Sequence, residues 1–197
     1  MPKIPELRLT LGQVAWALAR GVEPSPRLLA EMRYLRQVGI PFKRSEVGMG
    51  KGRSAHYDYF HLIELGVAFF GLRRGMRPKE IAKILVDYRK ALRPIYEEAF
   101  ANQPDSAVEA PWVKSRGTNA PAGLVDERFI RLHDRFSETP GKFDVVLVEE
   151  TEDATKLFMT VERYPGERDR TLAPVSRLAI ELVAWAKEAP VMKKGPR

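Results

Sequence analysis

The stretch GMGKGRSAHYDYF, residues 48–60, places three glycines around Lys51 and directly before Arg53. Glycine lets the backbone turn tightly and approach a ligand closely, while Lys and Arg donate hydrogen bonds to phosphate oxygens. A nucleotide-binding loop would need the G-x-x-x-x-G-K-[ST] spacing after a hydrophobic strand, and the sequence has neither. The stretch therefore indicates a cationic loop tip that contacts phosphate, with an ordinary solvent-exposed turn as the alternative.

Further cations lie in the segments that precede this tip. Lys43 and Arg44 open the loop, and the single acid between residues 43 and 53, Glu46, leaves a net charge of +3 there. Upstream, residues 23–39 predict a helix whose N-terminal side chains could face the base edges of DNA. We predict these DNA-binding residues: Ser25, Arg27, Arg33, Tyr34, Arg36, Lys43, Arg44, Lys51, Arg53 and Tyr57.

Side-chain chemistry assigns roles to some of them. Arg27 is assigned to base recognition, because a guanidinium can donate two parallel hydrogen bonds to guanine. Arg33 and Arg36 are assigned to phosphate, and the alternative for Arg33 is an ion pair with a neighbouring acid such as Glu64. Tyr57 is expected to pack at the base of the loop with its hydroxyl directed toward a phosphate.

Residues that could do acid–base or metal chemistry are few. His133–Asp134 and Glu149–Glu150 are sequence neighbours, which do not face each other on a helix or a strand. The chain has no cysteine and only three histidines, so we expect neither a disulfide framework nor a metal site. We predict that the protein is not an enzyme and needs no cofactor.

The excess positive charge belongs to the first half of the chain. The 197 residues carry a formal net charge of +7. Residues 1–102 contain 18 Lys and Arg against 10 Asp and Glu, whereas residues 103–197 contain 15 against 16. This asymmetry is typical of a nucleic-acid-binding part joined to a neutral part. Without a signal-peptide pattern or a run of roughly 18 apolar residues, the chain is predicted to be cytoplasmic.

Local signals predict the helices that position these cations. Thr10 and Gln13 form a capping-box pattern for a helix over 11–19. Ser25 suits the N-cap of the next helix, and Pro26 its first position. Residues 57–74 are apolar almost all round, which predicts a core helix.

A fourth helix is predicted to begin near Pro78. Its apolar residues follow the spacing of a coiled-coil seam: Ile81, Leu85, Tyr88, Leu92, Ile95 and Ala99. Pro94 interrupts this seam, because proline lacks an N–H and clashes with the preceding turn. We expect the helix to kink or restart there, which argues against a long dimerisation coil.

The second half is predicted to have a different organisation. A helix near 129–136, a hairpin built from 143–150 and 155–164, and an amphipathic helix over 171–189 make a small α+β module. The predicted divisions are a DNA-binding domain over 1–102, a linker or extended loop over 103–123, and the α+β module over 124–190.

Four segments of the first half resemble, in order and spacing, the MerR-like winged helix-turn-helix family. They are LRLTLGQVAWALARGVEPS, MRYLRQVGIPF, KRSEVGMGKGRSAHYDYFHLIEL and LRRGMRPKEIAKIL, which together cover about residues 7–86. The resemblance implies a mainly α, N-terminal winged helix-turn-helix domain, with the glycine-rich loop as its wing. The chain departs from the family in a longer turn between the first two helices, and the α+β module has no counterpart there.

These observations lead to one functional hypothesis and two alternatives. The hypothesis is a sequence-specific double-stranded DNA-binding protein, a transcriptional regulator that works as a homodimer. Its C-terminal module would serve dimerisation or the binding of a ligand or partner. The alternatives are a protein–protein interaction module on a winged-helix fold, and a DNA replication or partition protein.

Overall fold

The structure, a computed structural model, is mainly helical. It describes residues 4–42, 56–109, 112–115, 118–121, 128–132, 145–148 and 171–190. The helices are α1 (Leu11–Leu18), α2 (Pro26–Gln37), α3 (Tyr59–Arg73), α4 (Pro78–Ala101), α5 (Asp105–Glu109) and α7 (Val175–Glu188). The strands are β1 (Trp112–Ser115), β2 (Thr118–Pro121), β3 (Phe129–Leu132), β4 (Val145–Val148) and β5 (Thr171–Pro174). Within the described residues, no helix is both long and apolar enough to cross a membrane.

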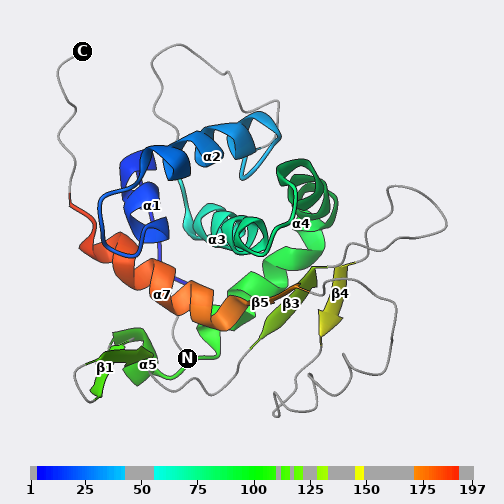
Figure 1. Cartoon of the computed structure of the whole chain (residues 1–197). Coiled ribbons are helices and arrows are strands. Elements are labelled where there is room, and N and C mark those ends of the chain that lie inside the picture. The colour runs from blue at the N-terminus through cyan, green and yellow to red at the C-terminus, as the bar shows by residue number, and fades with distance from the viewer. Residues whose placement is uncertain are drawn as a thin grey trace.

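Helix α3 lies at the centre of the fold, surrounded by α1, α2, α4 and α7 (Figure 1). Ten of its 15 residues are buried, and they occupy every side of the helix. This confirms the core helix predicted over 57–74, because a helix that is apolar all round must be covered on all sides. The capping-box start of α1 at Thr10 and the start of α2 at Ser25 are also confirmed.

Helix α7 packs into the same core as the N-terminal helices. Its buried residues contact α1, α3 and α4. A Cβ on Gly66 of α3 would lie 2.4 Å from Cδ1 of Leu182 in α7, so the two helices approach closely at that glycine. The sequence-based division placed this helix in a separate C-terminal module. The packing instead joins α7 to the helices of residues 1–102.

Helix α4 continues through Pro94 without a restart. Figure 1 shows the helix changing direction along its length, as expected for an internal proline. The predicted coiled-coil seam faces the core of the chain itself: Ile81, Leu85 and Leu92 are fully buried. This seam is therefore not available as a dimerisation coil.

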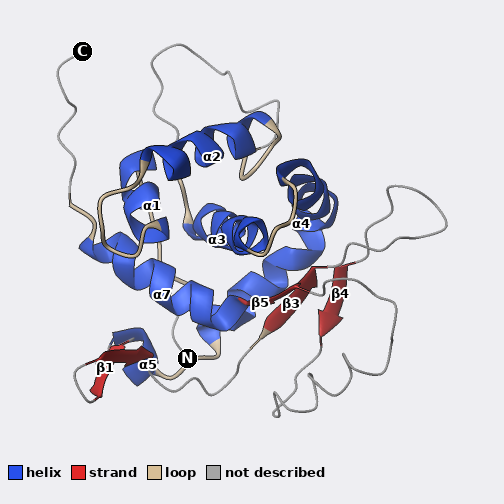
Figure 2. Ribbon diagram, viewed as in Figure 1, coloured by secondary structure: helices blue, strands red, loops and turns tan. Residues whose placement is uncertain are grey.

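The strands form two small antiparallel sheets (Figure 2), one of order β1-β2 and one of order β4-β3-β5. The helix predicted near 129–136 is wrong over Phe129–Leu132, because β3 pairs with a strand on each side and these long-range pairings override local propensity. For the same reason β5 takes the first four residues of the helix predicted over 171–189. The hairpin β1-β2 and helix α5 lie within the predicted linker, and the run 155–164 lies outside the described residues.

Candidate nucleic-acid interface

Helix α2 is held to the core by one face. Leu28, Met32 and Leu35 are buried at helical spacing, and each contributes about 1.5–3 kcal/mol of hydrophobic stabilisation. At the start of the helix, the Ser25 Oγ accepts a hydrogen bond of 3.2 Å from the Leu28 amide. This cap and the Pro26 at the first position begin the helix as the sequence predicted.

The opposite face of α2 is exposed to solvent. Arg27, Ala30, Arg33 and Gln37 all lie on this exposed face. The Arg27 guanidinium forms an ion pair of 2.9 Å with Glu31 one turn later, and 88% of the Arg27 side chain remains exposed. Such an exposed pair is worth at most about 1 kcal/mol, so it can open when a ligand approaches. The face offers two guanidinium groups with a small side chain between them.

Two of the residues of α2 that were predicted to contact DNA are less accessible than Arg27 and Arg33. Tyr34 and Arg36 are half-buried. The Arg36 guanidinium lies over the ring of Phe42, 5.9 Å from its centroid, which makes a cation–π contact. The alternative ion pair between Arg33 and Glu64 is not formed, because Glu64 pairs with Arg89 instead.

The two ends of the glycine-rich loop are held side by side. Leu9 and Tyr57 form an antiparallel bridge, with backbone hydrogen bonds of 2.8 and 2.9 Å in both directions. The rings of Phe42 and Tyr57 meet edge to face at 4.9 Å, and His61 lies 4.7 Å from Phe42. Phe42 and Tyr57, which lie just before and just after residues 43–55, therefore meet at one place next to the end of α2. Lys43, Arg44, Lys51 and Arg53 lie outside the described residues.

Tyr57 packs at the base of the loop as the sequence predicted, but its side chain is not exposed for a phosphate contact. Its side chain is 2% exposed, because the ring packs against Phe42 at the end of the loop. Burial raises the pKa of the Tyr57 hydroxyl, and the charge of Arg36 opposes this shift. A hydroxyl on a residue buried to this extent is poorly placed to reach a phosphate, so the predicted phosphate contact of Tyr57 is not supported.

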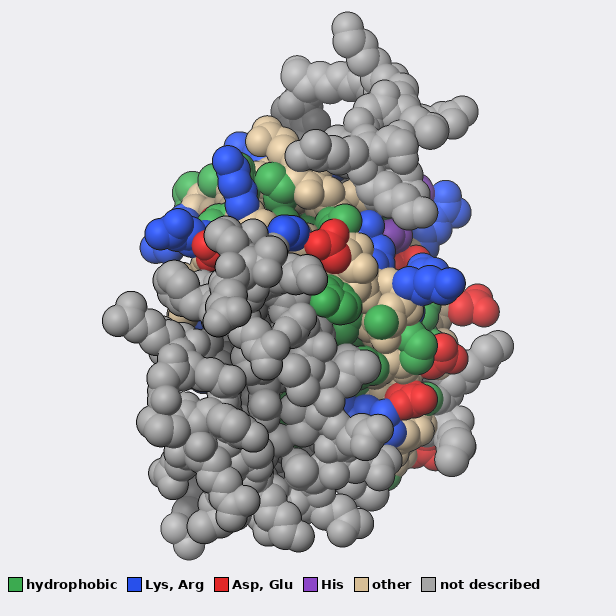
Figure 3. Space-filling view, turned by 90° about the vertical axis from the view of Figure 1, so that its right-hand side faces the viewer, with side chains coloured by type: hydrophobic (Ala, Val, Ile, Leu, Met, Phe, Trp, Pro, Cys, Tyr) green, Lys and Arg blue, Asp and Glu red, His purple; other side chains and the backbone are tan. Residues whose placement is uncertain are grey.

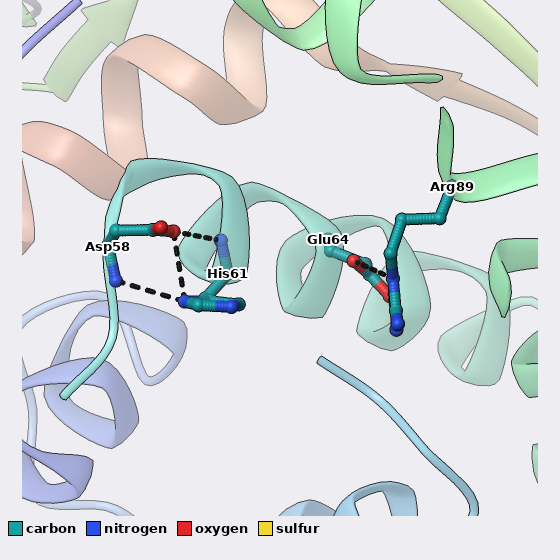
Figure 4. A network of polar contacts seen from close by, with 4 residues as sticks. All are labelled: Asp58, His61, Glu64 and Arg89. Carbon is teal, nitrogen blue, oxygen red and sulfur yellow. Dashed lines mark hydrogen bonds and ion pairs between the residues drawn. The ribbon is translucent and has the colours of Figure 1, made fainter. Parts of the chain in front are cut away.

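A buried ion pair lies next to the end of α2. Arg89 of α4 donates hydrogen bonds to both carboxylate oxygens of Glu64 in α3, at 2.6 and 3.0 Å (Figure 4). It also donates one of 2.7 Å to the carbonyl of Gly39, which follows α2. Burial raises the pKa of Glu64, and the Arg89 guanidinium acts in the opposite direction. The pair thus connects α3 and α4 to the start of the loop.

Asp58 and His61 fix the first turn of α3 beside the same loop (Figure 4). The His61 amide donates to Asp58 Oδ1 at 2.9 Å, and the Asp58 amide donates to His61 Nδ1 at 3.2 Å. Burial would raise the pKa of Asp58, but the hydrogen bonds and charge of His61 outweigh it and leave this pKa below its ordinary value. The reciprocal pair satisfies two backbone donors at the start of the helix.

Sequence reasoning missed Arg89, Ala30 and Gln37. A signal for the first existed, since the lone acid Glu64 in an apolar helix requires a cationic partner. Ala30 and Gln37 could have been found as the positions opposite the buried stripe of α2. On the side of the molecule that contains α4, Figure 3 shows Lys and Arg gathered over the upper half of the described surface, with Asp and Glu more frequent at the lower right.

The chemistry of the site is that of charge and hydrogen bonding. Among the described residues, no group of three or more His, Asp or Glu side chains could hold a metal ion. The predicted pairs His133–Asp134 and Glu149–Glu150 lie outside those residues. No protein-family model, curated protein or solved structure matches the chain.

Proposed function

We propose that the protein is a sequence-specific regulator that binds double-stranded DNA through a MerR-like winged helix-turn-helix. Helices α1 and α2 form the helix-turn-helix, and residues 43–55 form the wing. The observation that carries the proposal is the exposed face of α2, where Arg27 and Arg33 flank the small Ala30. The opposite face of the same helix is packed into the core, so the two cations project from a rigid support.

The dimensions and side chains of α2 suit the major groove. A helix about 10–12 Å across fits a groove about 12 Å wide. Arg27, at the first turn, would leave Glu31 and donate two hydrogen bonds to guanine. Ala30 would let the backbone approach closely and contact a thymine methyl, and Gln37 could pair with adenine. These contacts would supply the sequence preference.

Contacts to phosphate would supply most of the affinity. Arg33 and the four wing cations, Lys43, Arg44, Lys51 and Arg53, are the candidates. Four wing contacts alone predict a slope of about −3.6 for the logarithm of affinity against the logarithm of salt. Between about 50 and 200 mM salt, affinity should then fall roughly 100-fold. A salt-independent affinity would contradict the proposal.

The protein is proposed to act as a homodimer on two half-sites. A two-fold symmetric dimer would place its two α2 helices in successive major grooves, about 34 Å apart along the duplex. The dimer contact would use a surface other than the α4 seam, which is buried within the chain. Selection of bound DNA from a random pool tests both points, because a dimer should enrich a palindrome.

Matched lysine substitutions at Arg27 and Arg33 separate base recognition from charge. Arg27→Lys keeps the positive charge but loses the bidentate geometry. It should relax specificity at one base pair by about 1–3 kcal/mol while leaving non-specific affinity and its salt slope unchanged. Arg33→Lys is the matched control, and it should preserve both specificity and affinity if Arg33 contacts phosphate. Equal effects of the two substitutions on specificity would refute this division of roles.

A protein-interaction surface is the competing function. It would be favoured if acids from other elements neutralised the cations of α2. Among the described residues, the acid that pairs with Arg27 is Glu31 of the same helix, which favours the DNA proposal. Selection that enriches no DNA sequence, together with weak non-specific binding, would favour the competing function.

A further inference from the structure

A cavity of about 300 Å³ lies between α1 and α2 at the turn that joins them. Its walls come from four parts of the chain that lie together on the left of Figure 1. They include Ala15 and Trp16 of α1, Glu23 and Pro24 of the turn, Leu29 of α2, and Pro190 after α7. Glu23 and Pro190 are exposed, so the space opens to solvent and a ligand can enter it.

The volume sets the size of a possible ligand. At the roughly 30 Å³ that a water molecule takes in the liquid, the cavity holds about ten non-hydrogen atoms. The wall is largely apolar: Ala15 is fully buried, while Leu29 and Pro24 are half-buried. A wall of this kind favours a ligand with an apolar or aromatic group to bury.

Two side chains of the wall add a preference for positive charge. Glu23 is exposed at the rim of the cavity. Among the described residues that line the cavity, it is the one with an ionisable side chain. The Trp16 indole presents an aromatic ring, and indole is the strongest cation–π partner among side chains. A carboxylate and an indole around an apolar space form a suitable environment for a protonated amine attached to an aromatic or aliphatic group.

We propose that this cavity binds a small apolar amine of about ten non-hydrogen atoms. The ligand would contact both helices of the helix-turn-helix and the residue after α7. Provided that the proposed function holds, amine binding would change the affinity for DNA, and DNA would change the affinity for the amine by the same factor. The amine site itself does not depend on DNA binding and can be tested without it.

The test uses three probes of nearly equal size with different charge: 2-phenylethylamine, 2-phenylethanol and phenylacetate. Each is titrated into the ¹⁵N-labelled full chain while the indole N–H signals are followed, and Trp16→Phe identifies the Trp16 signal by its loss. We expect a saturable shift of this signal with the amine, a weaker affinity for the alcohol, and no binding of the carboxylate. Equal affinities for all three, or no saturable shift with any, would overturn the proposal.

Two substitutions test the wall itself. Ala15→Leu fills the cavity and should abolish binding of the amine and the alcohol. Glu23→Gln is exposed and should not disturb folding; it should weaken the amine about tenfold and leave the alcohol unchanged. Glu188→Gln, an exposed acid outside the cavity wall, is the matched control and should change neither. A Glu23→Gln variant that binds the amine as the native chain does would overturn the proposed charge preference.

Two further outcomes show whether the chain's own C-terminus occupies the cavity, and whether the amine site and the proposed DNA binding stand or fail separately. If probes bind only after removal of residues 191–197, the chain's own C-terminus fills the cavity and the amine proposal is wrong. If the amine binds as expected but the protein binds no DNA, the site stands and the proposed function fails.

Discussion

Replacing Gly21 with alanine tests whether α7 supports the turn between α1 and α2. Gly21 has a φ of +75°, and a Cβ there would lie 2.3 Å from Cζ3 of the Trp185 indole in α7. The left-handed backbone costs alanine about 1–2 kcal/mol, and overpacking against the ring adds about 1–3 kcal/mol. We therefore expect Gly21→Ala to lower the free energy of unfolding by about 2–5 kcal/mol.

Gly75 provides a matched control for the backbone term. It has a φ of +89°, but a Cβ there would meet nothing within 4 Å. Gly75→Ala should therefore cost only the backbone term of about 1–2 kcal/mol. Urea unfolding followed by circular dichroism measures both variants, provided that the slope against urea stays constant.

A double-mutant cycle isolates the contribution of the indole. In a Trp185→Leu background the ring is gone, so Gly21→Ala should cost about as much as Gly75→Ala does in the native chain. Equal losses for Gly21→Ala and Gly75→Ala in the native chain would refute the reasoning, because the indole would then impose no constraint on the turn.

Three further predictions concern the polar contacts around α2 and α3. Arg89→Met leaves the Glu64 carboxylate buried without its cation and should cost about 3–5 kcal/mol in urea unfolding. Because burial raises the pKa of Glu64, this loss should be smaller below the ordinary Glu pKa and grow as the pH rises. The pKa of Asp58 is lowered in the folded chain, so its carboxylate adds stability above the ordinary Asp pKa, and this stability is lost as the pH falls through the pKa of the folded state. Asp58→Asn should therefore flatten the pH dependence of the free energy of unfolding measured below about pH 4. Ser25→Ala should cost about 1 kcal/mol of stability, whereas Ser25→Asp should keep the cap but weaken DNA binding measured by fluorescence anisotropy.

The starts of the helices could be predicted because their signals are local. Thr10 with Gln13, and Ser25 with Pro26, satisfy backbone donors within one turn of the chain, so no distant residue is needed to form these caps. The central position of α3 also followed from its composition, since an apolar surface on all sides must be covered. The exposed cations Arg27 and Arg33 could be assigned to the surface of α2 by their spacing from Leu28 and its buried neighbours.

The remaining features depend on residues that are far apart in the chain. Phe129–Leu132 forms a strand because it pairs with β4 and β5, and its own sequence is compatible with a helix. Tyr57 is buried because Leu9 and Phe42 meet it from other segments. The partner of Glu64 is Arg89, 25 residues later, and no local pattern selects it from the other cations.

The sequence by itself therefore determined the caps and boundaries of the first helices, the core position of α3 and the charge difference between the two halves of the chain. The tertiary structure alone decided that α7 completes the core of the N-terminal helices, with Trp185 against Gly21 and Leu182 against Gly66. The physical reason is the range of the interactions. Capping and helical periodicity act within a few residues, whereas close packing at a glycine depends on which distant side chain fills the space.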